Sequence, residues 1–257
     1  TQQPSALLEL FVILGENENI KGIRASAIRQ LRLHRKLIDP DFREDATNRD
    51  LFMRLLRSPY KLSVHLKLMN RYGILGSYLP EFGKIVGQTQ HDLFHIYPVD
   101  VHTLELITNI RRLVQPEEAA KFPVSSHIFK NLPKPELIII AALYHDIAKG
   151  RPEDHSIAGA KIARRLGPRL GFTSEETALT EWLVEHHLVM SDVAQRRDRS
   201  RAVGAHEFAA RREAATGGDF GEIGRRAGNG FEALAAHAVV HRRGQQAAAV
   251  GMLRRVD

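Results

Sequence analysis

An unbroken apolar run, Leu137–Tyr144, leads directly into the pair His145 and Asp146. The pattern predicts one strongly apolar helix over residues 136–149, closed by Gly150 at its C-cap. A helix that is hydrophobic all round has to be buried by other parts of the chain. With 43% hydrophobic residues, the chain can supply such a core. We therefore expect the His145–Asp146 pair to be held by packing rather than by a loop.

Segments on both sides of this run also have the apolar spacing of helices, and none alternates as a half-buried strand does. Thr173 and Glu176 form a capping box, which predicts the start of another helix. The helices are expected over residues 7–14, 24–38, 50–57, 61–71, 99–114 and 157–166, and from 173 onward. Four prolines predict a loop with at most a short helical turn over residues 115–135. The predicted fold class is all-α.

The composition excludes several kinds of function. The chain has no cysteine, which rules out disulfides, thiolate nucleophiles and zinc sites built from cysteine. Its longest apolar runs fall far short of the roughly 20 residues of a membrane helix. We therefore expect no membrane partner, and the cytoplasm is the expected location. The chain begins with Thr rather than Met, which suggests a fragment of a longer protein.

The net charge of +7 could indicate a nucleic acid as partner. Many of the arginines, however, lie after residue 195, in a segment rich in Ala, Gly and Arg with few large apolar residues. Little core can form there, so residues 199–257 are expected to be an irregular basic tail, either poorly ordered or aberrant. A nucleic acid is therefore not the expected partner.

Histidines are concentrated in the middle of the chain. Eight of the thirteen lie between His91 and His187, with no cysteine to share metal ligation. Imidazoles and carboxylates are suitable ligands for divalent ions that activate phosphates. A His followed directly by Asp near the end of a rigid helix can present both side chains to one centre. The dipeptide alone is a weak signal, because His91 and Asp92 form a second copy that no apolar helix precedes.

The order of the remaining candidates resembles the HD phosphohydrolase superfamily: His102, His145–Asp146, His155 and His186–His187. A closer resemblance extends over about residues 1–198, to the central region of the bifunctional uridylyltransferase and uridylyl-removing enzymes that modify the PII protein. It rests on the strings NRYGILGSYLPEFGKIVGQTQHDLFHIYPVDVHTLELI (70–107), ALYHDIAKGRPEDHSIAGAKIA (142–163) and EWLVEHHLVMSDVAQRRD (181–198). It implies an HD-type helical domain over residues 91–198, preceded by a helical support region over residues 1–90.

The resemblance also implies a metal site. His102, His145 and Asp146 are the expected ligands of a first divalent ion, with Mn or Mg as the expected metal. His155 and His186 are expected to complete a second ion site or to contact the phosphate. His187 is the alternative to His186 in that role.

Phosphate binding requires cations near the same centre. Lys149 lies one helical turn beyond His145, so its ammonium group can reach the same opening. Lys149 and Arg151 are the expected phosphate-binding cations, and Asp146, Lys149 and His155 are the expected catalytic residues. In the family, the HD domain removes UMP from a tyrosine of PII, and other domains add UMP and sense glutamine. The expected function is metal-dependent phosphodiester hydrolysis, with uridylylated PII as substrate and partner.

One part of the family pattern is missing from this sequence. Relatives continue past the segment at 196–198 into a helix whose Asp is a candidate for closing the metal site. Three residues of this chain are candidates to replace that Asp: Asp192, Asp198 and Asp219. Two alternatives to a hydrolase therefore stay open. One is a catalytically incomplete helical module that regulates or binds a partner, and the other is nucleic-acid binding through the basic tail.

Overall fold

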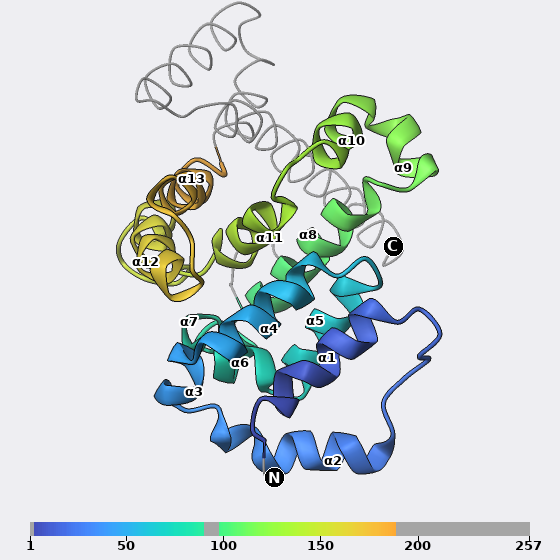
Figure 1. Ribbon diagram of the computed structural model, residues 1–257. Helices are drawn as coiled ribbons and strands as arrows, with labels where there is room; N and C mark the ends of the chain where they lie inside the picture. Colours follow the sequence, from blue (N-terminus) through green and yellow to red (C-terminus); the bar gives the residue numbers. More distant parts are fainter. Residues whose placement is uncertain (1–2, 90–97, 189–257) are drawn as a thin grey trace, which may run out of the picture.

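The computed structural model describes residues 3–89 and 98–188, and every regular element in these ranges is a helix (Figure 1). This confirms the predicted all-α fold class. The α-helices are α1 (Ala6–Glu16), α2 (Ala25–His34), α3 (Pro40–Glu44), α4 (Ala46–Arg57), α5 (Leu62–Arg71), α6 (Ile74–Tyr78), α7 (Pro80–Gly83), α8 (Val99–Arg112), α9 (Pro116–Lys121), α10 (Pro123–Lys130), α11 (Pro135–Tyr144), α12 (His155–Arg169) and α13 (Ser174–Glu185). A short 3-10 helix, η1 (Arg35–Leu37), follows α2. Within the described ranges, no helix has both the length and the apolar character needed to cross a membrane. The predicted tail at 199–257 lies outside the described residues.

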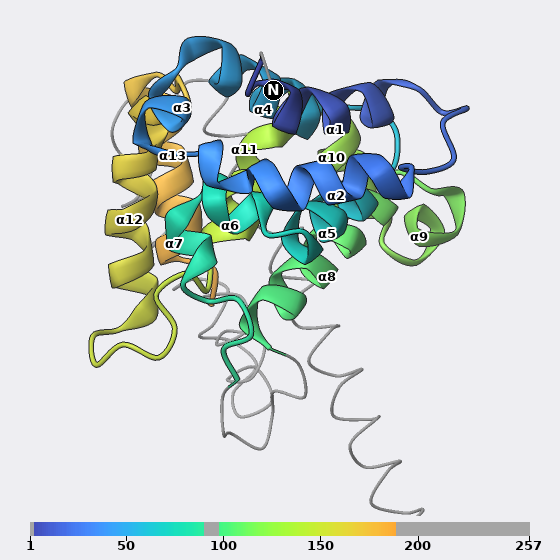
Figure 2. The same ribbon diagram turned by 90° about the horizontal axis from the view of Figure 1, so that it is seen from below.

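Helix α11 lies in the middle of the fold (Figures 1 and 2). Every residue from Glu136 to Tyr144 is buried, and α11 packs against α4, α8, α12 and α13. The paired helices α12 and α13 lie on one flank of α11, and α8 lies on the other (Figure 1). The buried helix expected from the apolar run is confirmed, and removal of its side chains from water fixes its position.

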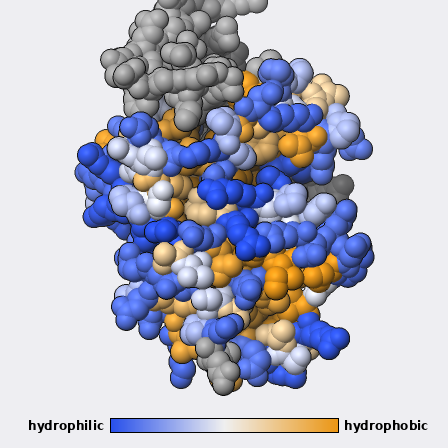
Figure 3. All heavy atoms as spheres, in the orientation of Figure 1, coloured by the Kyte–Doolittle hydropathy of each residue, from blue (hydrophilic) through white to orange (hydrophobic). Residues whose placement is uncertain are grey.

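One hydrophobic core runs through the described residues, from Leu7 in α1 to Val184 in α13. The N-terminal helices are joined to this core by polar contacts as well, since Arg57 Nε in α4 donates to the buried carboxylate of Glu136 in α11 at 2.8 Å. Hydrophilic side chains cover much of the outer face, with apolar areas among the N-terminal helices (Figure 3). The N-terminal helices and α11 therefore share one packed interior. The domain boundary expected near residue 90 stays a prediction.

The loop predicted over residues 115–135 is wrong for most of its length, because α9 and α10 occupy it. Pro116 and Pro123 are the first residues of these helices, and Pro135 begins α11 in the same way. Proline is well tolerated at this position, since its fixed φ suits a helix and the first N–H groups have no partner within the helix. These prolines therefore start helices instead of preventing them.

Helix α11 ends earlier than its apolar pattern predicted. The regular helix stops at Tyr144, and the chain continues in tight turns in which Ile147 N donates to Tyr144 O (3.2 Å) and Lys149 N donates to Asp146 O (3.0 Å). Gly150 closes the segment with φ +82°, a left-handed conformation that favours glycine. The His145–Asp146 pair is nevertheless buried. It sits on a turn anchored to the central helix, and that turn sets the directions of both side chains.

We expect Leu143→Ala in α11 to lower the free energy of unfolding by about 2–5 kcal/mol, because it leaves a cavity in the packed core. Leu143 is 0% exposed, whereas Leu33 in α2 is 64% exposed. The matched variant Leu33→Ala should change the free energy of unfolding by only about 0.5 kcal/mol or less. Urea denaturation measures both changes. Equal losses in the two variants would contradict the central position of α11.

Candidate metal centre

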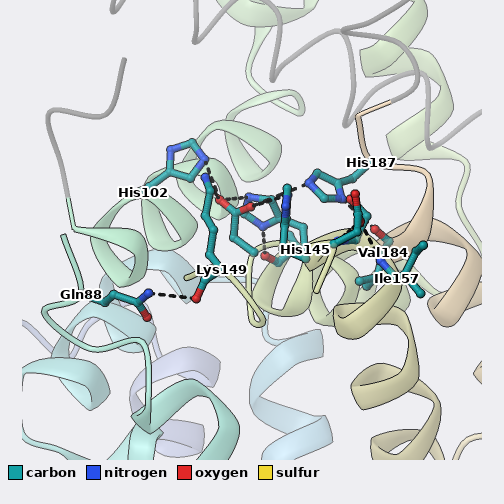
Figure 4. A network of polar contacts seen from close by, with 12 residues as sticks. Gln88, His102, His145, Lys149, Ile157, Val184 and His187 are labelled. Carbon is teal, nitrogen blue, oxygen red and sulfur yellow. Dashed lines mark hydrogen bonds and ion pairs between the residues drawn. The ribbon is translucent and has the colours of Figure 1, made fainter. Parts of the chain in front are cut away.

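Helix α8 supplies His102, and a buried carboxylate fixes the start of that helix. Asp100 accepts hydrogen bonds from Gly87 N at 3.0 Å and from Asn70 Nδ2 at 2.8 Å. Its negative charge also suits the N-terminal end of a helix. His102 lies on the same turn, and its Nε2 atom is 3.8 Å from Asp146 Oδ2 (Figure 4). Contacts with two earlier segments therefore hold the helix end that carries His102.

Backbone carbonyls orient two further imidazoles. His145 Nδ1 is 2.8 Å from Ala142 O, and His187 Nδ1 is 2.7 Å from Val184 O. A carbonyl oxygen only accepts hydrogen bonds, so in each neutral ring the proton is assigned to Nδ1. The Nε2 lone pair of each ring then points away from the backbone. In both residues, Nε2 faces the carboxylate of Asp146.

His155 is the first residue of α12, and the residue before it caps that helix. Asp154 Oδ1 accepts hydrogen bonds from Ser156 N at 2.9 Å and from Ile157 N at 3.2 Å. An aspartate cap satisfies N–H groups that have no partner within the helix and so fixes where α12 begins. As a result His155 Nε2 lies 3.6 Å from Asp146 Oδ1.

The carboxylate of Asp146 lies within reach of all four imidazoles. Its Oδ2 atom is 3.3 Å from His145 Nε2, 3.8 Å from His102 Nε2 and 2.8 Å from Lys149 Nζ. Its Oδ1 atom is 3.6 Å from His155 Nε2 and 3.8 Å from His187 Nε2. The two oxygens of one carboxylate therefore face two different pairs of histidines.

These contacts form two groups that could each hold a metal ion. The first is His102, His145 and Asp146, and the second is Asp146, His155 and His187. In each group the ligand atoms lie within 4.8 Å of one another. Imidazole and carboxylate donors of this kind suit divalent ions such as Mn²⁺.

One atom provides a test of whether the residues fit a cation. His187 Nε2 is buried and has no hydrogen-bond partner among the described residues. A buried polar atom that lacks a partner destabilises a protein by about 1–3 kcal/mol. A cation beside the carboxylate would accept the lone pair of this atom. The second group therefore fits a metal ion better than it fits a simple hydrogen-bond network.

The protonation states of the cluster also suit metal binding. Burial acts to raise the pKa of Asp146, but the opposing effects of His145, Lys149 and His187 hold that pKa well below its usual range. Burial, together with the nearby His145, lowers the pKa of His187 to about 3, although Asp146 partly opposes the shift. Burial also lowers the pKa of His155, partly opposed by Asp146. Near neutral pH the carboxylate is ionised and these two imidazoles are neutral, the forms that bind metals.

The structure brings together most of the side chains predicted for the site, but not all. His102, His145, Asp146, His155 and His187 form the two groups, and Lys149 contacts the shared carboxylate. His186 is in neither group. Its ring stacks on Trp182, with centroids 4.9 Å apart, and its Nδ1 atom is 3.0 Å from Trp182 O. Arg151 is exposed, just beyond the turn.

The position of His187 follows from where α13 ends. The helix stops at Glu185, and His186 and His187 lie in the turn that follows. Residues four apart lie on the same face of a helix, and His186 packs on Trp182 in this way. The turn directs the next side chain toward Asp146. No Gly or Pro marks this helix end, so the local sequence carried no signal that favoured His187.

Several candidate site residues lie outside the part of the chain that the structure describes. Asp192, Asp198 and Asp219, considered as closing ligands, lie outside the described residues. The same holds for His91 and His95, which the sequence leaves open as further contributors to the site. Their contribution to the site therefore stays a prediction.

Comparison with known proteins agrees with this geometry. Residues 1–78 match the third domain of the uridylyltransferase GlnD, and residues 99–216 match the HD domain. The two matches follow one another along the chain and leave residues 79–98 between them. The resemblance inferred from the sequence is thereby confirmed. The two groups of possible metal ligands lie within the span of the HD match.

Individual relatives carry the name bifunctional uridylyltransferase/uridylyl-removing enzyme. The chain is 54% identical to the relative from Ectopseudomonas mendocina over 206 residues, which is 80% of this chain and 23% of the relative. It is 54% identical to the Azotobacter vinelandii relative over 208 residues, covering 81% of this chain and 23% of that protein. The Nitrosococcus oceani relative is 54% identical over 195 residues, covering 76% and 22%. The chain thus spans about a quarter of the length of these relatives.

The lowered pKa of His187 predicts an acid-sensitive, metal-free protein. In the unfolded chain the imidazole pKa is about 6.5, so as the pH falls below that value the unfolded state takes up a proton that the folded state does not. The free energy of unfolding should therefore fall with pH. Between about pH 7 and about pH 5, His187 should account for up to about 2 kcal/mol of this loss. His155 adds a loss of the same sign.

The measurement is urea denaturation in the presence of a chelator at both pH values. His187→Gln cannot titrate, so its loss of stability between the two pH values should be smaller than that of the wild type. His127→Gln, which changes an exposed residue in α10, is the control and should retain the full loss. A wild-type pH dependence in His187→Gln would contradict the prediction.

Proposed function

We propose that the chain catalyses divalent-metal-dependent hydrolysis of a phosphodiester in the cytoplasm, and that its substrate is the uridylylated form of the PII protein. The observation that carries this proposal is the position of Asp146, whose two carboxylate oxygens face two pairs of histidines. A carboxylate in that position suits a pair of cations that share it as a bridging ligand. Such paired sites are used for phosphoryl chemistry.

The proposal divides the ligands between two positions. His102, His145 and Asp146 would hold one ion, and Asp146, His155 and His187 would hold the other, with Mn²⁺ or Mg²⁺ as the metal. Bound divalent ions would neutralise phosphoryl oxygens and lower the pKa of water in the site. The chain itself contributes neutral imidazoles with fixed orientations and an ionised carboxylate. The hydrogen bonds to Ala142 O and Val184 O keep two of these rings aligned.

Lys149 is the proposed phosphate-binding residue. Its ammonium nitrogen lies 2.8 Å from Asp146 Oδ2, and its side chain is 12% exposed. Because it is mostly withdrawn from water, its charge is only weakly screened and can act on a phosphoryl oxygen beside the carboxylate. Removal of UMP from tyrosine releases a phenol with a pKa of about 10, which needs less help from an acid than an alkoxide does. We assign no general acid for this reason.

The choice of PII as substrate rests on the family resemblance of the sequence. The name of the relatives pairs a uridylyltransferase with a uridylyl-removing activity. An HD domain with a histidine and aspartate cluster supports the hydrolytic half of that name, because removal of a uridylyl group breaks a phosphodiester bond. We do not propose a uridylyltransferase activity for this chain.

Asp146→Asn should abolish the proposed activity. The amide preserves the shape of the side chain but removes the negative charge that both metal positions would share. Loss of several kcal/mol of charge stabilisation corresponds to a decrease in turnover of at least about a hundredfold. The assay measures UMP release from uridylylated PII with added Mn²⁺. Asp50→Asn, at a side chain that is 74% exposed, is the matched control and should leave turnover unchanged.

A folded wild-type chain that binds no divalent metal and releases no UMP would overturn the hydrolase proposal. That result would favour the alternative of a catalytically incomplete module that binds a partner. Metal binding without UMP release, combined with cleavage of a small phosphodiester, would reject PII as the substrate while leaving the hydrolase in place.

Lys149→Met tests the phosphate-binding role separately from metal binding. The substitution removes the ammonium group next to Asp146, so the affinity for Mn²⁺ should stay the same or rise. Loss of a hydrogen bond to a charged group, about 1.5–3 kcal/mol, should lower kcat/KM for a phosphodiester by about tenfold to a hundredfold. Lys161→Met, at a side chain that is 62% exposed, is the control. A large loss of Mn²⁺ affinity in Lys149→Met would instead assign Lys149 to holding the carboxylate in place.

A further inference from the structure

One residue outside the cluster of ligands touches both sides of the proposed metal centre. The side-chain amide of Gln88 donates to Lys149 O at 2.9 Å (Figure 4), and its backbone carbonyl accepts from Val99 N at 2.9 Å. The first bond reaches the turn that carries Asp146, and the second reaches the first residue of α8. Gln88 therefore links the two segments that supply the first metal group.

The residues around Gln88 are fitted closely to this arrangement. Gly150 has φ +82°, and a Cβ atom at that position would lie 2.2 Å from Gln88 Nε2. The adjacent Gly87 N donates to Asp100 Oδ1 at 3.0 Å, which fixes the same end of α8. A Cβ at position 150 would push the amide of Gln88 out of its present position. The glycine therefore permits the hydrogen bond between Gln88 and Lys149 O.

The geometry of the first metal group depends on this contact. His102 is on α8 and Asp146 is on the turn after α11. The 3.8 Å between His102 Nε2 and Asp146 Oδ2 therefore holds only if α8 and this turn keep their alignment. A metal site requires its ligands to stay within about 0.5 Å of the productive geometry. A small slip of α8 along the turn would exceed that tolerance without unfolding the helix.

We propose that Gln88 is a positioning residue for the metal centre, which sets the distance between the His102 side and the Asp146 side of the first group. The inference rests on the proposed function, because it assumes that this group binds a divalent ion. Gln88 is not among the candidate ligands. Its effect passes through the carbonyl of Lys149 and the amide of Val99.

The test is Mn²⁺ binding to the full chain, measured by titration calorimetry after chelator treatment. Gln88→Met keeps the length of the side chain but removes the donor, and it should lower the affinity for Mn²⁺ by about tenfold, as loss of a contact behind a metal ligand does. The thermal midpoint of the metal-free protein should change by less than about 4 °C. Gln115→Met, at an exposed residue in another part of the chain, is the control and should keep wild-type affinity.

A second set of variants detects the same contact without relying on one substitution. Gly150→Ala places a Cβ against the amide of Gln88 and should also weaken Mn²⁺ binding. If both variants act by disturbing one contact, their effects should not add. The double variant Gln88→Met/Gly150→Ala should then bind Mn²⁺ about as well as whichever of the two single variants binds it more weakly.

Two results would overturn the positioning role while the wild type binds Mn²⁺. One is wild-type Mn²⁺ affinity in Gln88→Met. The other is a loss of Mn²⁺ affinity in Gln88→Met and Gly150→Ala in which the thermal midpoint of each metal-free variant also falls by clearly more than about 4 °C. That result would make Gln88 a purely structural residue. Failure of the wild type to bind Mn²⁺ would overturn the metal centre itself, and with it the role assigned to Gln88.

Discussion

Helix α11 is buried along its whole length, so it is stable only while α4, α8, α12 and α13 cover it. Three of these covering helices also determine where the histidines lie. His102 is on α8, His155 begins α12, and His187 follows α13 directly. The packing that removes Leu137–Tyr144 from water therefore also gathers the imidazoles at the end where α11 stops. The hydrophobic effect assembles a polar site at this end because the turn beyond Tyr144 is the point on which these helices converge.

A buried carboxylate among four imidazoles and an ammonium group is costly to desolvate, and the fold offsets that cost with directed contacts. Lys149 pairs with Asp146 Oδ2 at 2.8 Å, while carbonyl oxygens of the helix ends hold His145 and His187. These contacts leave Nε2 of His187 facing the carboxylate without a hydrogen-bond partner among the described residues. An arrangement that stabilises only the charges would have turned this atom toward a donor. This buried nitrogen without a hydrogen-bond partner makes the cluster suited to a cation.

Much of the fold and of the candidate site could be predicted from the sequence, because the patterns that indicate them are local. The apolar run identified the central helix, and the histidines near it identified the members of the site. The errors concerned where helices begin and end. Pro116 and Pro123 began helices because the N1 position tolerates proline. His187 reached the cluster and His186 did not, because α13 ends at Glu185 without a marker in the sequence. Gln88 carried no signal, since its partners lie 11 and 61 residues away in the chain.

The N-terminal helices are more than a support placed beside the HD region. Asn70 in α5 holds Asp100, Gly87 binds the same carboxylate, and Arg57 in α4 binds Glu136 at the start of α11. Gly87 and Gln88 belong to residues 79–98, between the two family matches that end at 78 and begin at 99. The alignment of His102 with Asp146 thus depends on a connecting segment that belongs to neither match. A division of the chain at the family boundaries would separate the candidate ligands from the contacts that align them. The candidate metal centre therefore depends on α4 and α5 as well as on the helices within the HD match.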